Sequence, residues 1–81
     1  MLEVPRFFFH LYDDRVSLDE EGKELPTVTA ARDEAVWNAR HMACAEVIEG
    51  HLGLNHRIEV TDVNDAPVIT VHFNDVVKLH P

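Results

Sequence analysis

The sequence has one cysteine, three glycines and no long apolar run. Because Cys44 has no second cysteine to pair with, we expect no disulfide framework, and a reducing, cytoplasmic setting fits best. Phe7, Phe8 and Phe9 are too few for a signal peptide or a membrane-spanning segment. Three glycines also leave no phosphate-binding loop, dinucleotide fingerprint or nucleophile elbow. These absences argue against disulfide-stabilised scaffolds, membrane-inserted proteins and nucleotide-binding enzymes.

Basic residues are also scarce. Seven lysines and arginines stand against fifteen aspartates and glutamates, which gives a net charge of −8 with neutral histidines. Nonspecific nucleic-acid affinity depends on neutralising phosphates, and here the basic residues are scattered singly. Direct binding to nucleic acid or to an anionic membrane is therefore disfavoured. Half of the acidic excess lies between Asp13 and Glu24. This acidic run is either a solvated loop that keeps the protein soluble or a docking surface for a basic partner.

Hydrophobic residues make up 46% of the 81 residues, which fits one folded domain and leaves no room for a second. We expect a single domain over residues 1–81, with an ordered core from about residue 5 to residue 75. The C-terminal tail, residues 76–81, has no predicted element.

The N-terminal part predicts a strand that is ended by acids. Residues 6–12 are rich in aromatic residues and favour a strand whose alternate side chains lie on opposite faces. Asp13 and Asp14 end it, and Val16–Leu18 predicts a short second strand. Asp19–Gly22 is typical of a type I turn closed by a positive φ at its glycine. One face of the first strand carries Phe7, Phe9 and Leu11, and the other carries Phe8, His10 and Tyr12.

A helix is predicted after Pro26. Thr27 is a suitable N-cap, with Thr29 as its competitor, and Gly50 or Gly53 supplies the C-terminal stop. Small apolar residues recur every three or four positions, and the alanines among them would let the helix lie close to a sheet. This narrow stripe consists of Val28, Ala31, Ala35, Ala39, Met42, Ala43 and Val47.

Residues 57–62 and 67–73 alternate strictly in polarity, which predicts a β-hairpin. Asn64 and Asp65 tolerate positive φ and suit a two-residue turn. A slip of one residue would invert the two faces, so the register is strongly specified. Pro67 fits only at the start or edge of a strand. The predicted pairs are Val60 with Ile69, Ile58 with Val71, Glu59 with Thr70, and Arg57 with His72.

These elements predict an α+β fold of the order β-β-α-β-β, with one antiparallel sheet and a single helix packed on one face. The chain offers nothing to cover the other face of the sheet. An exposed face with aromatic content usually indicates a partner or self-association. That face carries Phe8, His10, Tyr12, Glu59, Thr61, Thr70 and His72.

Several segments follow a familiar pattern in order. Arg-Phe-Phe-Phe-His-Leu at the N-terminus is followed by Asp-Glu-Glu-Gly-Lys-Glu-Leu-Pro, Ala-Ala-Arg-Asp-Glu-Ala and Ile-Glu-Val-Thr-Asp. Together they resemble short bacterial proteins of unknown function, domain-of-unknown-function family 6894. The resemblance implies a small cytoplasmic domain built of helix and sheet, and it implies no activity. The chain departs from the pattern at Asp65, where glycine is usual, and at Trp37, His41 and Ile48, where charged or small residues are usual.

Six histidines raise the question of a metal site. Zinc sites need about three or four clustered ligands at short spacings, and no HxH, HxxxH, HExxH or CxxC motif is present. His10 and His72 are weak candidates, because both point from the predicted open face and could bind metal or titrate together. Cys44 lies mid-helix, away from the helix N-terminus that favours activated cysteines. We therefore expect no metal, no cofactor and no catalytic residue.

A second helical stripe holds Trp37, His41, Cys44 and Ile48, roughly opposite the alanines. One helix cannot bury both stripes against one sheet. Trp37 is therefore either partly exposed without a role or part of an oligomer or partner contact, where tryptophan is over-represented.

The leading functional hypothesis is a non-catalytic protein-interaction module that self-associates, as a dimer. The contact would be the open sheet face, through Phe8, His10, Tyr12, Thr70 and His72, or the second helix stripe, through Trp37, His41 and Ile48. One alternative is an antitoxin-like or regulatory partner of a basic protein, a suggestion from architecture alone. Another is a weak binder of metal or a small ligand through His10 and His72.

Overall fold

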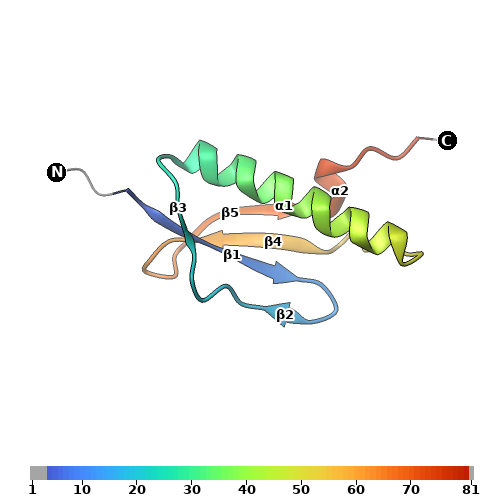
Figure 1. Ribbon diagram of the computed structural model, residues 1–81, viewed down its shortest axis with the longest axis horizontal. Coiled ribbons are helices and arrows are strands. Elements are labelled where there is room, and N and C mark those ends of the chain that lie inside the picture. The colour runs from blue at the N-terminus through green and yellow to red at the C-terminus, as the bar shows by residue number, and fades with distance from the viewer. Residues whose placement is uncertain (1–3, 81) are drawn as a thin grey trace.

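The computed structural model describes residues 4–80, so the outermost residues of the predicted domain, 1–3 and 81, lie outside the described part. All strand pairs are antiparallel, in the order β2-β1-β4-β5, and β3 also pairs with β1. Figure 1 shows α1 running along one side of this sheet, next to β5. The predicted α+β class and β-β-α-β-β order are confirmed, with β3 and α2 as short additions. The elements are β1 Arg6–Tyr12, β2 Val16–Ser17, β3 Lys23–Glu24, α1 Val28–Ile48, β4 Arg57–Thr61, β5 Pro67–His72 and α2 Phe73–Val76.

The helix α1 begins and ends where the sequence predicts. Thr27 has extended backbone, with φ −144°, and its hydroxyl accepts a hydrogen bond from the Ala30 amide at 3.0 Å. Glu49 is the C-cap, and Gly50 follows it at φ 93°. The side chains that α1 buries are small, which lets its backbone come close to the sheet. They are Ala31, Ala35, Ala39 and Ala43.

Three larger side chains predicted on this buried stripe are exposed instead. Val28, Met42 and Val47 expose 53%, 41% and 59% of their surface. Val28 is the first helical residue, whereas Met42 and Val47 flank the alanine row on opposite sides, at about 100° per residue. A helix seated on alanines therefore leaves its larger flanking side chains beside the sheet rather than under it.

The β4–β5 hairpin has the predicted register from Arg57–His72 to Val60–Ile69. The turn is longer than the two residues predicted. The Asp62 amide donates to the Ala66 carbonyl at 3.0 Å, and Asp65 takes a φ of 62°. A type I turn closed by a residue of positive φ is the usual three-residue hairpin connection. Thr61 pairs with Pro67, so Val68 is a bulge without a partner.

The core lies between α1 and the sheet face that carries Phe7, Ile58, Val60 and Val71, all of them buried. Phe73, predicted as the last residue of the hairpin, begins α2 and is fully buried. Its amide donates to the His56 carbonyl at 2.8 Å, which continues the β4–β5 ladder by one bond.

Candidate functional site

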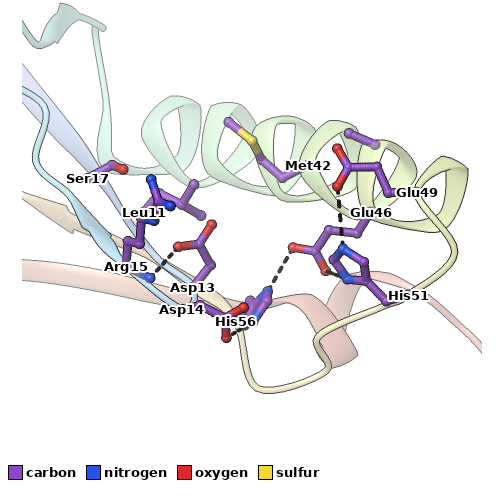
Figure 2. A pocket seen from close by; sticks show the side chains of 11 residues that line it. Leu11, Asp13, Asp14, Arg15, Ser17, Met42, Glu46, Glu49, His51 and His56 are labelled. Atoms are coloured by element: carbon purple, nitrogen blue, oxygen red, sulfur yellow. Dashed lines mark hydrogen bonds and ion pairs between the residues drawn. The ribbon is translucent and has the colours of Figure 1, made fainter.

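A cavity of about 450 Å³ opens between the C-terminal half of α1, the turn after β1 and the loop before β4. Figure 2 shows carboxylates and imidazoles from these three segments facing one another. We call it the acid–histidine pocket. Its lining consists of Leu11, Asp13, Asp14, Arg15, Ser17, Met42, Ala45, Glu46, Glu49, His51 and His56.

Glu46 and His56 form the centre of the acid–histidine pocket. His56 Nδ1 and Glu46 Oε2 are 2.7 Å apart, and Glu46 Oε1 accepts from the Gly53 amide, also at 2.7 Å. Only 16% of the His56 side chain and 13% of the Glu46 side chain are exposed. Glu46 follows Ala39 and Ala43 on the buried side of α1, at a point where the loop rather than the sheet covers the helix. A buried carboxylate is stable there because both of its oxygens have partners.

The charges around His56 favour its protonated form. The hydrogen bond to Glu46 raises the pKa of His56, burial opposes this rise, and the negative charges of Glu46, Asp14 and Asp13 add to it. Asp14 Oδ1 lies 3.7 Å from His56 Nε2. His56 therefore joins α1 to the turn that follows β1.

The central groups of the acid–histidine pocket, Glu46 and His56, hold the loop between α1 and β4 in place. Both oxygens of Glu46 and one nitrogen of His56 are occupied by contacts within the chain. His51 lies at the rim, with its Nε2 3.5 Å from Glu49 Oε2. Across residues 4–80 the structure shows no group of three or more His, Cys, Asp or Glu side chains arranged to hold a metal ion. The contacts of Glu46 with Gly53 and His56, and of His56 with Asp14, join α1 to the loop and the turn, and we call them the polar latch.

His10 does not lie on an open face, contrary to the prediction. Only 9% of its surface is exposed. His10 Nδ1 accepts a hydrogen bond from the Asp19 amide at 3.0 Å, so Nε2 carries the proton and donates to Thr61 Oγ1, also at 3.0 Å. The segment from Leu18 to Gly22 folds back over this part of the sheet, and that cover could not be derived from the strand pattern.

The carboxylate of Asp19 binds three backbone amides. It accepts hydrogen bonds from Phe9, Glu21 and Gly22 at 3.0, 3.1 and 3.0 Å. Burial raises the pKa of Asp19, but the three hydrogen bonds from backbone amides lower it by more, so the pKa lies below its ordinary value. Hydrogen bonds thus join the N-terminal aromatic segment to the acidic turn that follows it in the sequence.

Gly22 completes the cover over the first strand. Its φ is 71°, and a Cβ there would lie 2.9 Å from both the Phe7 carbonyl oxygen and the Phe8 ring. Phe8 is therefore half-buried. The predicted positive φ at this glycine is confirmed, and the close approach is a second reason for glycine.

The other residues predicted on the open sheet face have mixed positions. The Arg57 guanidinium lies 4.4 Å from the centroid of the Tyr12 ring, which is half-buried. Thr70 and His72 are exposed. Strand β4 lies between β1 and β5, so His10 and His72 are not neighbours. The predicted pair of histidines is not formed.

The second helix stripe is exposed, as predicted. Trp37 exposes 59% of its surface and Ile48 exposes 81%. The Trp37 and His41 rings are in contact, with their centroids 3.7 Å apart and their planes tilted by 38°. His41 and Cys44 are also exposed. We call these four residues the Trp37 stripe.

The sequence interpretation missed Glu46, His56 and Asp19. One signal for Glu46 was present, because it falls at the end of the alanine stripe, where an acid needs a partner. The partner itself follows from the path of the loop after α1, which no periodicity describes. The same holds for Asp19, whose partners depend on how the acidic turn folds back.

By its architecture the chain is a one-sheet, one-helix α+β domain with a polar latch at one end and an exposed stripe on its helix. It belongs to the family described as a domain of unknown function (DUF6894), whose model matches residues 6–74. Searches of curated proteins and of solved structures find no match to the chain. Among the described residues, no helix has both the length and the apolar character that a membrane crossing requires.

Proposed function

We propose that this protein is a non-catalytic protein-interaction module that associates with a second copy of itself through the Trp37 stripe. The observation that supports the proposal is the distribution of side chains on α1, which buries small residues and exposes large apolar ones. Its buried residues are all alanines, whereas Trp37 and Ile48 face solvent. The alanine face alone supplies the buried residues of α1 that pack in the core. Large exposed apolar residues on the opposite face fit an interface, where tryptophan is a frequent energetic centre.

A second copy is the partner that the charges favour. The chain carries a net charge of −8, so two copies repel one another over most of their surface. The Trp37 stripe itself contains no acid. Beside Trp37 lie two acids, Asp33 and Glu34, and Lys23 pairs with Glu34 at 3.0 Å. Two such stripes can therefore meet in a closed two-fold contact, the commonest symmetry of homodimers.

The sheet face supports this contact less well. In its β1 half, His10 is buried beside the segment that bonds to it, and Arg57 lies over the Tyr12 ring. The docking role of the acidic run also has less support, because Asp19 binds backbone amides and Glu24 pairs with Arg6 at 3.0 Å. We place the protein in the cytoplasm on the ground that its single cysteine, Cys44, is free and exposed.

Sedimentation velocity over a concentration series tests the proposal with Trp37→Glu. Loss of an interface tryptophan costs about 2 kcal/mol or more of association free energy, or roughly thirtyfold in Kd. Val63→Glu is the matched control, since Val63 is 66% exposed and lies in the hairpin turn away from α1. We expect weaker association for Trp37→Glu and wild-type association for Val63→Glu. A wild-type chain that stays monomeric at high concentration contradicts self-association, and equal association of both variants contradicts the role of the stripe.

A further inference from the structure

The β5 strand has one unpaired edge. It pairs with β4 on one side, and within residues 4–80 no segment pairs with it on the other. The Phe73 amide bonds to the His56 carbonyl, so by antiparallel alternation Val71 also points its backbone groups toward β4. Thr70 and His72 then point their amides and carbonyls outward. These two residues form an open ladder, and their side chains are exposed as well.

Most features that block strand addition are missing from this edge. Natural edge strands are protected by charged side chains, prolines, bulges or a covering segment. In β5, Pro67 and the bulge at Val68 protect only the start. From Ile69 to His72 the strand holds no acid, lysine or arginine. In Figure 1 the chain after α2 leads away from β5 and does not cover it.

A groove runs beside the open edge, between β5 and α1. Its apolar floor includes Val36, Val71 and Val76. Its charges balance, since Arg32 and Arg40 stand with Asp33 and Asp75. In a chain of net charge −8 this is a place where two copies can approach without net repulsion.

We propose that the open edge of β5 pairs antiparallel with β5 of a second copy, about a two-fold axis at Val71. Thr70 of one copy then exchanges backbone hydrogen bonds with His72 of the other, and each copy uses both of its outward residues. On the helix side the two Val71 side chains meet across the axis, next to the apolar floor of each groove. The sheet becomes continuous across both copies.

The charges of the two grooves are complementary in this arrangement. The strand β5 and the helix α1 run in the same direction in Figure 1, and Arg40 bonds to the Val76 carbonyl at 3.0 Å. Arg40 and Asp75 therefore lie toward the end of β5, and Arg32 and Asp33 toward its start. An antiparallel pairing brings the end of one groove to the start of the other, so that each meeting point holds two bases and two acids.

This contact goes beyond the proposed function, because it uses a different side of the protein from the Trp37 stripe. Two independent two-fold contacts on one chain extend the assembly beyond a dimer. Removal of either contact should leave a dimer held by the other.

Hydrogen–deuterium exchange followed by NMR tests the edge contact on the wild-type chain. We expect the Thr70 and His72 amides to gain at least tenfold protection as protein concentration rises. The Val71 and Phe73 amides should be protected at every concentration, because they bond within the chain. Free exchange at Thr70 and His72 at all concentrations would overturn the proposal, even if the protein associates by another route.

Thr70→Pro tests the same contact by removing one outward amide without removing a bond inside the protomer. Thr70→Val is the matched control, since it keeps the amide. We expect Thr70→Pro to lose the concentration-dependent protection of His72 and Thr70→Val to retain it. Should Thr70→Pro unfold, the wild-type exchange result decides alone. In Trp37→Glu the protection should persist, so failure of the stripe and failure of the edge give different results.

Discussion

The two edges of the sheet differ in how their backbone groups are satisfied. The outer edge of β1 pairs with β2 at one end and β3 at the other, and between them the Asp19 carboxylate accepts from Phe9. His10 fixes the same segment by accepting from the Asp19 amide. On the other side of the sheet, β5 has no described neighbour beyond β4.

This difference gives His10 and Asp19 a structural role, because their hydrogen bonds hold the acidic turn against the edge of β1. Asp19 supplies an acceptor where two short strands leave a gap, and without it a buried amide would lack a partner. A chain that closes one edge so fully and leaves an uncharged stretch on the other has one edge available for pairing. The predictions below alter one edge at a time.

The largest effect is expected from Asp19→Ala. Three amides lose their acceptor, and those of Phe9 and Gly22 are partly buried. An unsatisfied buried donor costs about 1–3 kcal/mol, so we expect a loss of about 3 kcal/mol in the free energy of unfolding. Denaturant unfolding measures the change. Glu20→Ala, in the same turn, removes an exposed acid and should change stability by less than about 0.5 kcal/mol. Equal effects of the two variants would show that the edge does not depend on Asp19.

Acid should reproduce the loss caused by Asp19→Ala. Because the pKa of Asp19 is lowered in the fold, its contribution is present above the ordinary value of 3.8 and is lost as pH falls through the lowered pKa. The difference in stability between the wild type and Asp19→Ala should therefore shrink on acidification below that value. A constant difference would contradict the assigned role of the carboxylate.

A smaller effect is expected from Gly22→Ala, compared with Gly50→Ala. Both glycines have positive φ, but a Cβ at Gly22 meets the Phe7 carbonyl at 2.9 Å and a Cβ at Gly50 meets nothing within 4 Å. The positive φ costs about 1 kcal/mol at either site, and the clash adds about 1 kcal/mol more at Gly22. Thermal or denaturant unfolding of the two variants separates these contributions. The same loss at both sites would mean that the turn relaxes away from β1.

The sequence predicts the helices and strands of this fold better than it predicts which loops and turns lie over the sheet. Helix caps and strand register depend on neighbouring residues and on strict alternation, so Thr27 and the pairs from Arg57 to Val60 are predicted correctly. The bulge at Val68 was missed because Asp65 makes a three-residue turn where a two-residue turn also fits the pattern. Local rules thus determine the elements, and small changes in turn length remain open.

The sites were harder to predict because they depend on the paths of turns and loops, which no periodic pattern describes. Exposure of the Trp37 stripe follows from helical period alone. Burial of His10 depends on Asp19, and the acid–histidine pocket depends on a loop that returns from Gly50 to His56. The open edge of β5 required the strand order, which alternation within a strand cannot supply.

A further prediction concerns the end of β1, where His56 lies near Asp14. The hydrogen bond to Glu46 raises the pKa of His56, so the stability that its protonated form contributes is full below the ordinary value of about 6.5 and is lost as pH rises through the raised pKa. A charged hydrogen bond exceeds a neutral one by about 1 kcal/mol, which is the loss we expect from wild-type unfolding measured across that range. Glu46→Gln should remove this pH dependence, and Glu49→Gln, on the exposed rim, should retain it. A flat wild-type profile would contradict the charged pair.

The smallest effect on stability, and the sharpest contrast between the edges, is expected from Thr70→Lys. Thr70 is exposed and its backbone faces outward, so a lysine there meets no folded contact and should change the free energy of unfolding of the dilute protein by less than about 0.5 kcal/mol. The same lysine places a charge on the open ladder, where edge charges prevent pairing, so protection of the His72 amide at high concentration should be lost. The β1 edge responds to Asp19→Ala in the opposite way, with a large loss of stability. A Thr70→Lys variant that unfolds easily would show that β5 is already covered within the protomer, and the contrast between the two edges would then be wrong.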